Sequence, residues 1–163
     1  MISEKDISFK FYRRIDPTIS DCDILGIDSK YFKPLWNTNE DQVIDLLGKL
    51  SSSVKHMVWF NTADSTGGVQ ATVLPYVKRY FKTQLLFNRE LYTKGYYGGR
   101  IYTDYYAREW SVVDRDPIYS KPITDKNMLK KITVSWNYGL VGGYCRNSIV
   151  QHGVCLLYTS PSP

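Results

Sequence analysis

The segment Asp64-Ser65-Thr66-Gly67-Gly68 joins a carboxylate, two hydroxyl groups and two glycines. Glycines let the backbone approach a ligand, and hydroxyls with backbone amides can cradle a phosphate or a sugar. The segment has neither the Gly-Lys-Ser/Thr of a Walker A loop nor the spacing of GxGxxG. A tight turn, with Asp or Ser capping the next helix, explains the same residues. The pattern thus indicates either a polar binding loop or a capped turn.

A second chemically rich segment runs from Tyr96 to Tyr106 and contains Tyr97-Gly98-Gly99-Arg100, then Asp104-Tyr105. Tyrosine rings can stack on a sugar or a base, and Arg100 offers a fork for a phosphate. Gly98-Gly99 beside Arg100 has no obvious role in a core. The segment therefore indicates a carbohydrate or nucleotide platform, or else tyrosines that pack half-buried at a domain rim.

The elements that must position these segments begin with a strand, a helix and a strand. Residues 23–28 form a short apolar run bounded by acids, and residues 54–60 are rich in β-branched and aromatic residues;. Between them, residues 39–50 carry an apolar stripe behind a Thr38 or Asn39 cap;. A βαβ unit of this kind has parallel strands, so we predict an α/β fold: a Rossmann-like parallel sheet with helices on its faces.

Ligands of such sheets sit beyond the carboxyl ends of the strands. Those ends are Asp28-Ser29-Lys30 and the segment from Asn61 to Gly68. We therefore add Ser29 and Lys30 to the candidate binding residues. Further along, the sequence predicts a helix broken by Pro75 at residues 69–77 and strands at residues 80–86 and 132–136;. It also predicts a turn at residues 95–100, a loop at residues 114–125 and a short helix at residues 125–131;. The period of residues 101–110 is ambiguous;.

Composition places the chain among ordinary globular proteins. Of its 163 residues, 43% are hydrophobic and 23% are charged, unlike a disordered or fibrous chain. The net charge is +5, and residues 78–131 hold twelve Lys or Arg against six Asp or Glu. Nine of the 14 tyrosines lie between Tyr76 and Tyr119. This basic, tyrosine-rich middle suits an anionic ligand, or it serves only solubility.

The two ends of the chain carry separate expectations. The polar N-terminus lacks the apolar region of a secretory signal, and three scattered cysteines indicate no disulfide framework, so we expect a cytoplasmic protein;. Residues 155–163 resemble an in-frame translation of a sequencing adapter, so we expect them to make no core contacts. The predicted domain is therefore 1–154, incomplete at its C-terminal end. With only two histidines and no metal-ligand spacing, we predict no metal site;.

Six blocks of the sequence are specific as a set: the segments 22–32, 58–67, 73–77, 82–86, 97–106 and 135–140. Together they resemble bacterial glycosyltransferase-like proteins of surface-polysaccharide gene clusters. The resemblance implies the N-terminal, acceptor-side half of a GT-B protein, truncated before a second domain that binds a nucleotide-sugar donor. It implies a glycan or lipid-linked acceptor, no cofactor, and room for peripheral contact with the inner face of the membrane.

Within that resemblance, two carboxylates can take the proton of an acceptor hydroxyl. These are Asp64 and Asp104, the candidate catalytic residues. The candidate substrate-binding residues are Ser29, Lys30, Ser65, Thr66, Gly67, Tyr97, Gly98, Gly99, Arg100 and Tyr105. The alternative is a non-catalytic α/β module that binds RNA or another anionic ligand through stacked tyrosines and basic residues, although no RNP-type motif occurs.

Overall fold

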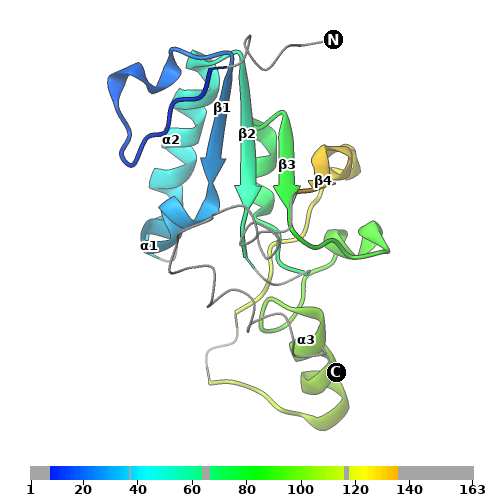
Figure 1. The fold of residues 1–163 in the computed structure, drawn as a ribbon. Helices are drawn as coiled ribbons and strands as arrows, with labels where there is room; N and C mark the ends of the chain where they lie inside the picture. The colour runs from blue at the N-terminus through cyan, green and yellow to red at the C-terminus, as the bar shows by residue number, and fades with distance from the viewer. Residues whose placement is uncertain (1–7, 37, 64–66, 116–117, 136–163) are drawn as a thin grey trace, which may run out of the picture.

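The computed structural model describes residues 8–36, 38–63, 67–115 and 118–135, and these form a parallel four-stranded sheet (Figure 1). The strands are β1 (Ile24–Asp28), β2 (His56–Asn61), β3 (Arg79–Lys82) and β4 (Ile132–Val134), in the order β1-β2-β3-β4. Every neighbouring pair is parallel. The prediction of a parallel α/β sheet is therefore confirmed.

The predicted βαβ unit is present, with β1 and β2 adjacent and α2 (Glu40–Ser53) between them in the chain. Ile24 lies opposite His56, and Asp28 lies opposite Phe60. This register brings the carboxyl ends of the two strands to the same edge, where Ser29 and Thr62 follow. The unit fixes the first half of the candidate site.

Helix α2 begins where its polar cap predicted and ends one turn later than expected. The Asn39 side chain accepts a hydrogen bond from the backbone N–H of Gln42 at 3.1 Å. The expected end was at residue 50, because three serines follow. Their hydroxyls instead donate to carbonyls three or four residues earlier, at 2.8–2.9 Å, which lets the helix continue to Ser53;.

The remaining elements are short. They are η2 (Pro17–Ser20), η3 (Ser29–Phe32), α1 (Lys33–Trp36), η4 (Ala71–Tyr76), η5 (Arg89–Thr93), α3 (Ile101–Trp110) and η6 (Lys126–Lys131). The predicted helix at 69–77 is a 3-10 helix containing Pro75. The strand predicted at 80–86 stops at Lys82, and the segment of ambiguous period is α3.

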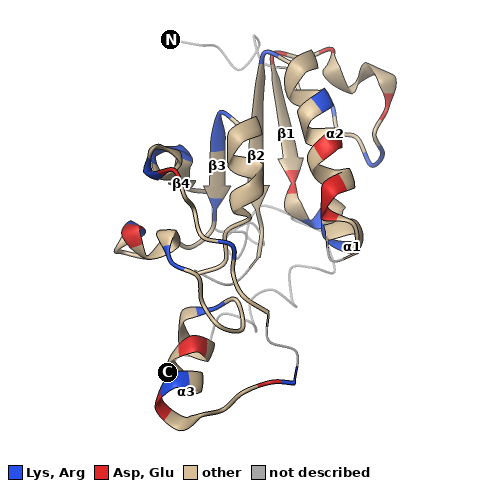
Figure 2. Cartoon of the chain, turned by 180° about the vertical axis from the view of Figure 1, so that it is seen from behind, with Lys and Arg blue, Asp and Glu red and all other residues tan. Residues whose placement is uncertain are grey.

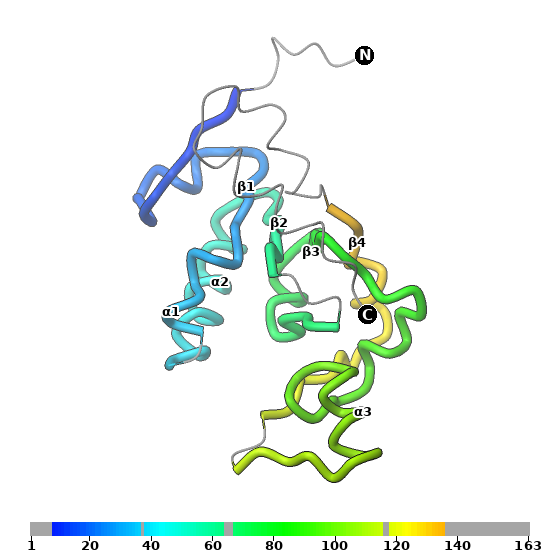
Figure 3. Tube along the Cα trace, turned by 60° about the horizontal axis from the view of Figure 1, so that its bottom comes forward, coloured from blue at the N-terminus to red at the C-terminus, as the bar shows by residue number. Residues whose placement is uncertain are grey.

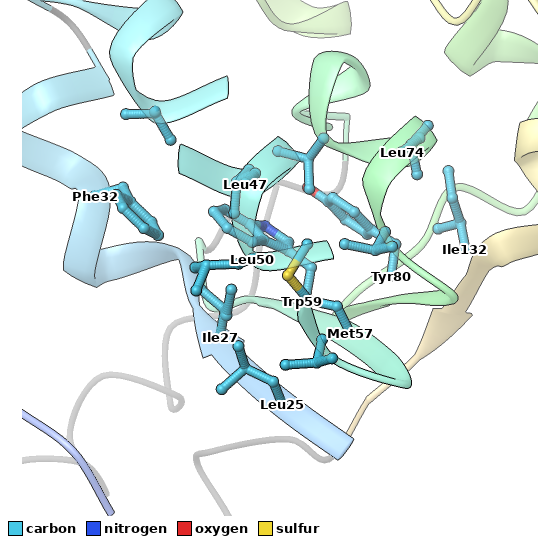
Figure 4. Packing of buried hydrophobic residues seen from close by; sticks show 14 of the residues in the cluster. Leu25, Ile27, Phe32, Leu47, Leu50, Met57, Trp59, Leu74, Tyr80 and Ile132 are labelled. Atoms are coloured by element: carbon cyan, nitrogen blue, oxygen red, sulfur yellow. The ribbon is translucent and has the colours of Figure 1, made fainter. Parts of the chain in front are cut away.

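The core lies on one face of the sheet, where alternate strand residues are buried (Figure 4). Trp59 is central: its ring stacks on Phe32 at a centroid distance of 5.8 Å and tilts against Trp36 at 6.1 Å. Leu47 of α2 and Leu74 of η4 close the same cluster. We expected helices on both faces, but the helices packed in the described core cover this one. Right-handed crossovers between parallel strands in sequential order place the connecting helices α2 and η4 on the same side.

Several expectations fall outside the described residues. These include the tail 155–163, the loop residues Asp64, Ser65 and Thr66, and the final block of the resemblance beyond Ser135. Among the described residues, every helix is too short or too polar to cross a bilayer.

Candidate functional site

Asp28 joins the carboxyl ends of β1 and β2. Its Oδ1 accepts a hydrogen bond from the Lys30 backbone N–H at 2.9 Å, which caps η3, and another from Thr62 Oγ1 at 3.0 Å. Asp28 itself is exposed. Its second oxygen, Oδ2, has no hydrogen-bond partner among the described residues. Sequence reasoning named Asp28 as a strand end without selecting it as a site residue.

Ser29 strengthens the same junction, whereas Lys30 points outward. Ser29 is buried, and its Oγ accepts a hydrogen bond from the Thr62 backbone N–H at 3.2 Å. Lys30 is exposed, and its ammonium is available to an anionic group at this edge. The structure thus brings the two predicted residues to the carboxyl edge, with Ser29 as a support and Lys30 as a surface group.

Asn61 and Thr62 lie at the same edge but were not among the candidate residues predicted from the sequence. Both are buried at the end of β2. Asn61 Nδ2 donates to the Tyr80 hydroxyl at 2.5 Å, and Asn61 Oδ1 accepts from the Ala63 backbone N–H at 2.9 Å. The Tyr80 hydroxyl also accepts from the Gln70 N–H at 3.1 Å, and burial raises the pKa of Tyr80 to about 12. These bonds hold both ends of the loop that contains residues 64–66.

Lys82 is the corresponding residue at the end of β3. It lies in register with Asn61, and its side chain is fully buried. A buried ammonium at a sheet edge is uncommon because removing the charge from water is costly. The signal that could have selected Asn61, Thr62 and Lys82 is their place as polar residues at the last positions of parallel strands.

The turn before α3 is built by its own glycines and by Thr103. Gly98 and Gly99 adopt positive φ angles of 64° and 72°. The Thr103 hydroxyl lies 2.7 Å from the Tyr97 carbonyl and 2.8 Å from the Arg100 carbonyl. A Cβ on Gly98 would lie 2.6 Å from Thr103 Oγ1, so the turn requires glycine at that position;.

Asp104 is engaged within this same segment. Its Oδ1 accepts from the Tyr97 backbone N–H at 3.1 Å, and its Oδ2 pairs with Arg108 Nε at 2.9 Å. Arg100 donates to the Tyr102 hydroxyl and lies over that ring, 5.6 Å from its centroid. Tyr105 is exposed on α3. The predicted residues Tyr97, Arg100 and Asp104 are therefore held by contacts with other residues of the same segment.

The two candidate segments meet at Gly67 and Ile101. A Cβ built on Gly67 would lie 3.7 Å from Ile101 Cγ1 and 3.9 Å from the Ile101 backbone nitrogen. Gly67 closes the loop that follows β2, and Ile101 opens α3 directly after Arg100. This approach brings the end of the loop after β2 next to the start of α3, while Asp64, Ser65 and Thr66 lie outside the described residues.

Helix α3 lies beyond the carboxyl ends of the strands in both orientations of the molecule (Figures 1 and 3). The described residues contain no group of three or more His, Cys, Asp or Glu side chains placed to hold a metal ion. The site is therefore a polar edge formed by Asp28, Ser29, Asn61, Thr62 and Lys82, with the α3 segment next to it.

Comparisons with protein-family models, with curated proteins and with solved structures found no significant match for this chain.

Proposed function

We propose that this chain is the acceptor-side domain of a GT-B glycosyltransferase, which moves a sugar from a nucleotide-sugar donor to a glycan or lipid-linked acceptor. The observation that supports the proposal is the cluster of polar groups at the carboxyl edge of a parallel sheet, from Asp28 to Lys82. Ligands of open parallel sheets bind at that edge. The donor would bind to a second domain that faces it.

In the proposed reaction, the acceptor hydroxyl oxygen forms a bond to the anomeric carbon of the donor sugar. The bond from that carbon to the nucleotide diphosphate breaks, and the diphosphate leaves with the electron pair. A carboxylate takes the hydroxyl proton. We assign this role to Asp64, because Asp104 already accepts a hydrogen bond from the Tyr97 N–H through one oxygen and forms an ion pair with Arg108 through the other. Asp104 then acts as a positioning residue for the turn at Gly98.

Charge placement favours this function over the RNA-binding alternative. Basic residues gather at the start of β3 and on η6, where Arg79 Nη1 donates to the Lys130 carbonyl at 3.2 Å. Figure 2 shows both colours of charge on α3, which carries the exposed aromatic residues, and η6 beside β4. RNA binding would need aromatic side chains for base stacking and basic side chains for phosphate neutralisation on one surface. Here exposed aromatic residues lie on α3, whereas the basic residues gather on β3 and η6.

The first test is binding to the chain itself. Ligand-detected NMR should show contact with oligosaccharide acceptors and weaker contact with free nucleotide sugars such as UDP-glucose and GDP-mannose. Asp28→Asn should lower acceptor binding, while Asp21→Asn, an exposed acid before β1, should not. Tighter binding of nucleotide sugars than of any acceptor would overturn the acceptor-side assignment.

The second test measures release of nucleotide diphosphate by a protein that contains this domain and its donor-binding partner. Asp64→Asn should abolish transfer while leaving the melting temperature within the range of surface substitutions. Normal turnover in Asp64→Asn would remove this residue from the reaction.

A further inference from the structure

Helix α3 exposes an unusual number of large aromatic side chains. Tyr102, Tyr105, Tyr106 and Trp110 are between 48% and 61% exposed, and no residue of the helix is buried. A helix of a globular domain normally buries an apolar stripe against the core. On α3 these rings are instead about half exposed.

The rings form an ordered face. Tyr102, Tyr106 and Trp110 are spaced four residues apart, so they follow one another along one side of the helix. Tyr106 and Trp110 stack at a centroid distance of 5.0 Å and an angle of 26°, and Tyr105 packs edge-on against Trp110 at 5.8 Å. These mutual contacts hold the rings in place before any ligand arrives, which lowers the entropic cost of binding.

The segment that carries this face has no net charge. Residues 100–121 contain four basic and four acidic residues, although residues 78–131 as a whole are strongly basic. Arg100 is bonded to Tyr102, and Arg108 is paired with Asp104. The arginines nearest to the rings are thus already engaged within the segment. This charge pattern matches an uncharged ligand better than a polyanion or an anionic bilayer.

The helix is also fixed in place. The Tyr96 backbone N–H donates to Ser120 Oγ at 2.9 Å, and the Ser120 N–H donates to the Tyr96 carbonyl at 3.1 Å. Tyr97 and Tyr119 form an antiparallel bridge beside these bonds. Together with the approach of Gly67 to Ile101, they hold the aromatic face beyond the carboxyl edge of the sheet (Figure 3).

We propose that the face formed by Tyr102, Tyr105, Tyr106 and Trp110 binds a neutral glycan chain. One side of a sugar ring presents polarised C–H groups that pack on the electron-rich face of an aromatic ring, while its hydroxyls stay in contact with water. The inference rests on the proposed function, because it assigns this face to the acceptor and names the acceptor as an uncharged polysaccharide.

The experiment measures binding of the 163-residue chain to immobilised neutral polysaccharides: dextran, galactan, mannan and rhamnan. Poly(U) RNA, heparin and vesicles of phosphatidylcholine with phosphatidylglycerol are tested beside them. We expect at least one neutral glycan to bind. Trp110→Ala and Tyr106→Ala should each weaken that binding at least about fivefold, because each removes one stacking surface.

Phe11→Ala is the matched control, since Phe11 is a 93% exposed aromatic residue outside α3. It should bind as the unmodified chain does. Because all three side chains are exposed, circular dichroism should show the same fold in each variant. The proposal is wrong if only RNA, heparin or vesicles bind, if no neutral glycan binds, or if Trp110→Ala binds glycan normally.

The two proposals can fail separately. Glycan binding that depends on Trp110, without any sugar transfer by the two-domain protein, would support glycan binding by the aromatic face and overturn the proposed transferase function. If sugar transfer to a short acceptor is unaffected by Trp110→Ala and no polysaccharide binds, the transferase function is supported and glycan binding by the aromatic face is overturned.

Discussion

The Thr62 hydroxyl donates a hydrogen bond to Asp28 Oδ1 at 3.0 Å. This bond joins two residues 34 positions apart in the chain and ties together the carboxyl ends of β1 and β2. The same oxygen caps η3 through the Lys30 N–H. Asp28 therefore holds the backbone through one oxygen, while its second oxygen has no hydrogen-bond partner among the described residues.

Two substitutions at Asp28 separate these roles. Asp28→Ala removes both hydrogen bonds and should lower the free energy of unfolding by about 1–2 kcal/mol, as loss of a cap does. Asp28→Asn keeps an oxygen acceptor and should cost less than half as much. Urea denaturation of both variants measures the difference. Equal losses would mean that the charge, and not the acceptor, stabilises the edge.

The two glycines before α3 should differ in their tolerance of alanine. Both have positive φ angles, but a Cβ on Gly98 would meet Thr103 at 2.6 Å, whereas a Cβ on Gly99 would meet nothing within 4 Å. Gly99→Ala should cost about 1 kcal/mol for its backbone conformation alone. Gly98→Ala should cost clearly more, because the Thr103 side chain must also move.

Hydrogen exchange of the α3 amides is the most direct measurement of this difference, since the strain is local. Exchange should accelerate more in Gly98→Ala than in Gly99→Ala. The same acceleration in both variants would show that the close contact with Thr103 relaxes without cost.

Stability at high pH should depend on Tyr80. Burial raises the pKa of its hydroxyl from 10.0 to about 12, so the folded state retains the proton in the pH range where the unfolded chain releases it. The stabilisation is complete below pH 10 and is lost as the pH rises toward 12. The free energy of unfolding should therefore fall over that range, and less steeply in Tyr80→Phe.

At neutral pH, Tyr80→Phe should destabilise the protein by about 1–3 kcal/mol, because Asn61 Nδ2 and the Gln70 N–H lose their acceptor;. The penalty relative to the unmodified protein should shrink above pH 10. A constant penalty from pH 7 to pH 11.5 would contradict the assignment to Tyr80.

If the proposed transferase function holds, Asp104 should behave as a positioning residue. Asp104→Asn retains an oxygen that can accept from the Tyr97 N–H, so it should keep most of the transfer rate of the two-domain protein. Asp104→Ala removes this acceptor and should raise KM for the acceptor more than it lowers kcat. Loss of kcat in Asp104→Asn, with an unchanged KM, would instead mark Asp104 as the base.

The first βαβ unit could be predicted because its signals are local. Val43, Leu47 and Leu50 of the predicted stripe are buried, and so are Ile27 and Trp59 of the two apolar runs, whereas Leu46 is partly buried and Ile24 is exposed. The serines after Leu50 misled the prediction of the helix end, since their hydroxyls bond to the helix itself rather than ending it.

The candidate site was harder to predict because it depends on contacts between distant residues. Ser29 was selected from its place after a strand, but its bond to Thr62 depends on the register of β1 and β2. Nothing local marks Lys82 as buried or Asn61 as the partner of Tyr80. Likewise, α3 lacks a buried stripe, so its sequence showed no clear helical period.

The paired hydrogen bonds between Tyr96 and Ser120 bring together the two ends of the segment that carries α3. Residues 97–119 are therefore an insertion with adjoining ends, and a short linker could replace them without pulling any strand out of register. Exchange of this one cassette could change what the protein recognises while the sheet and its carboxyl edge stay the same.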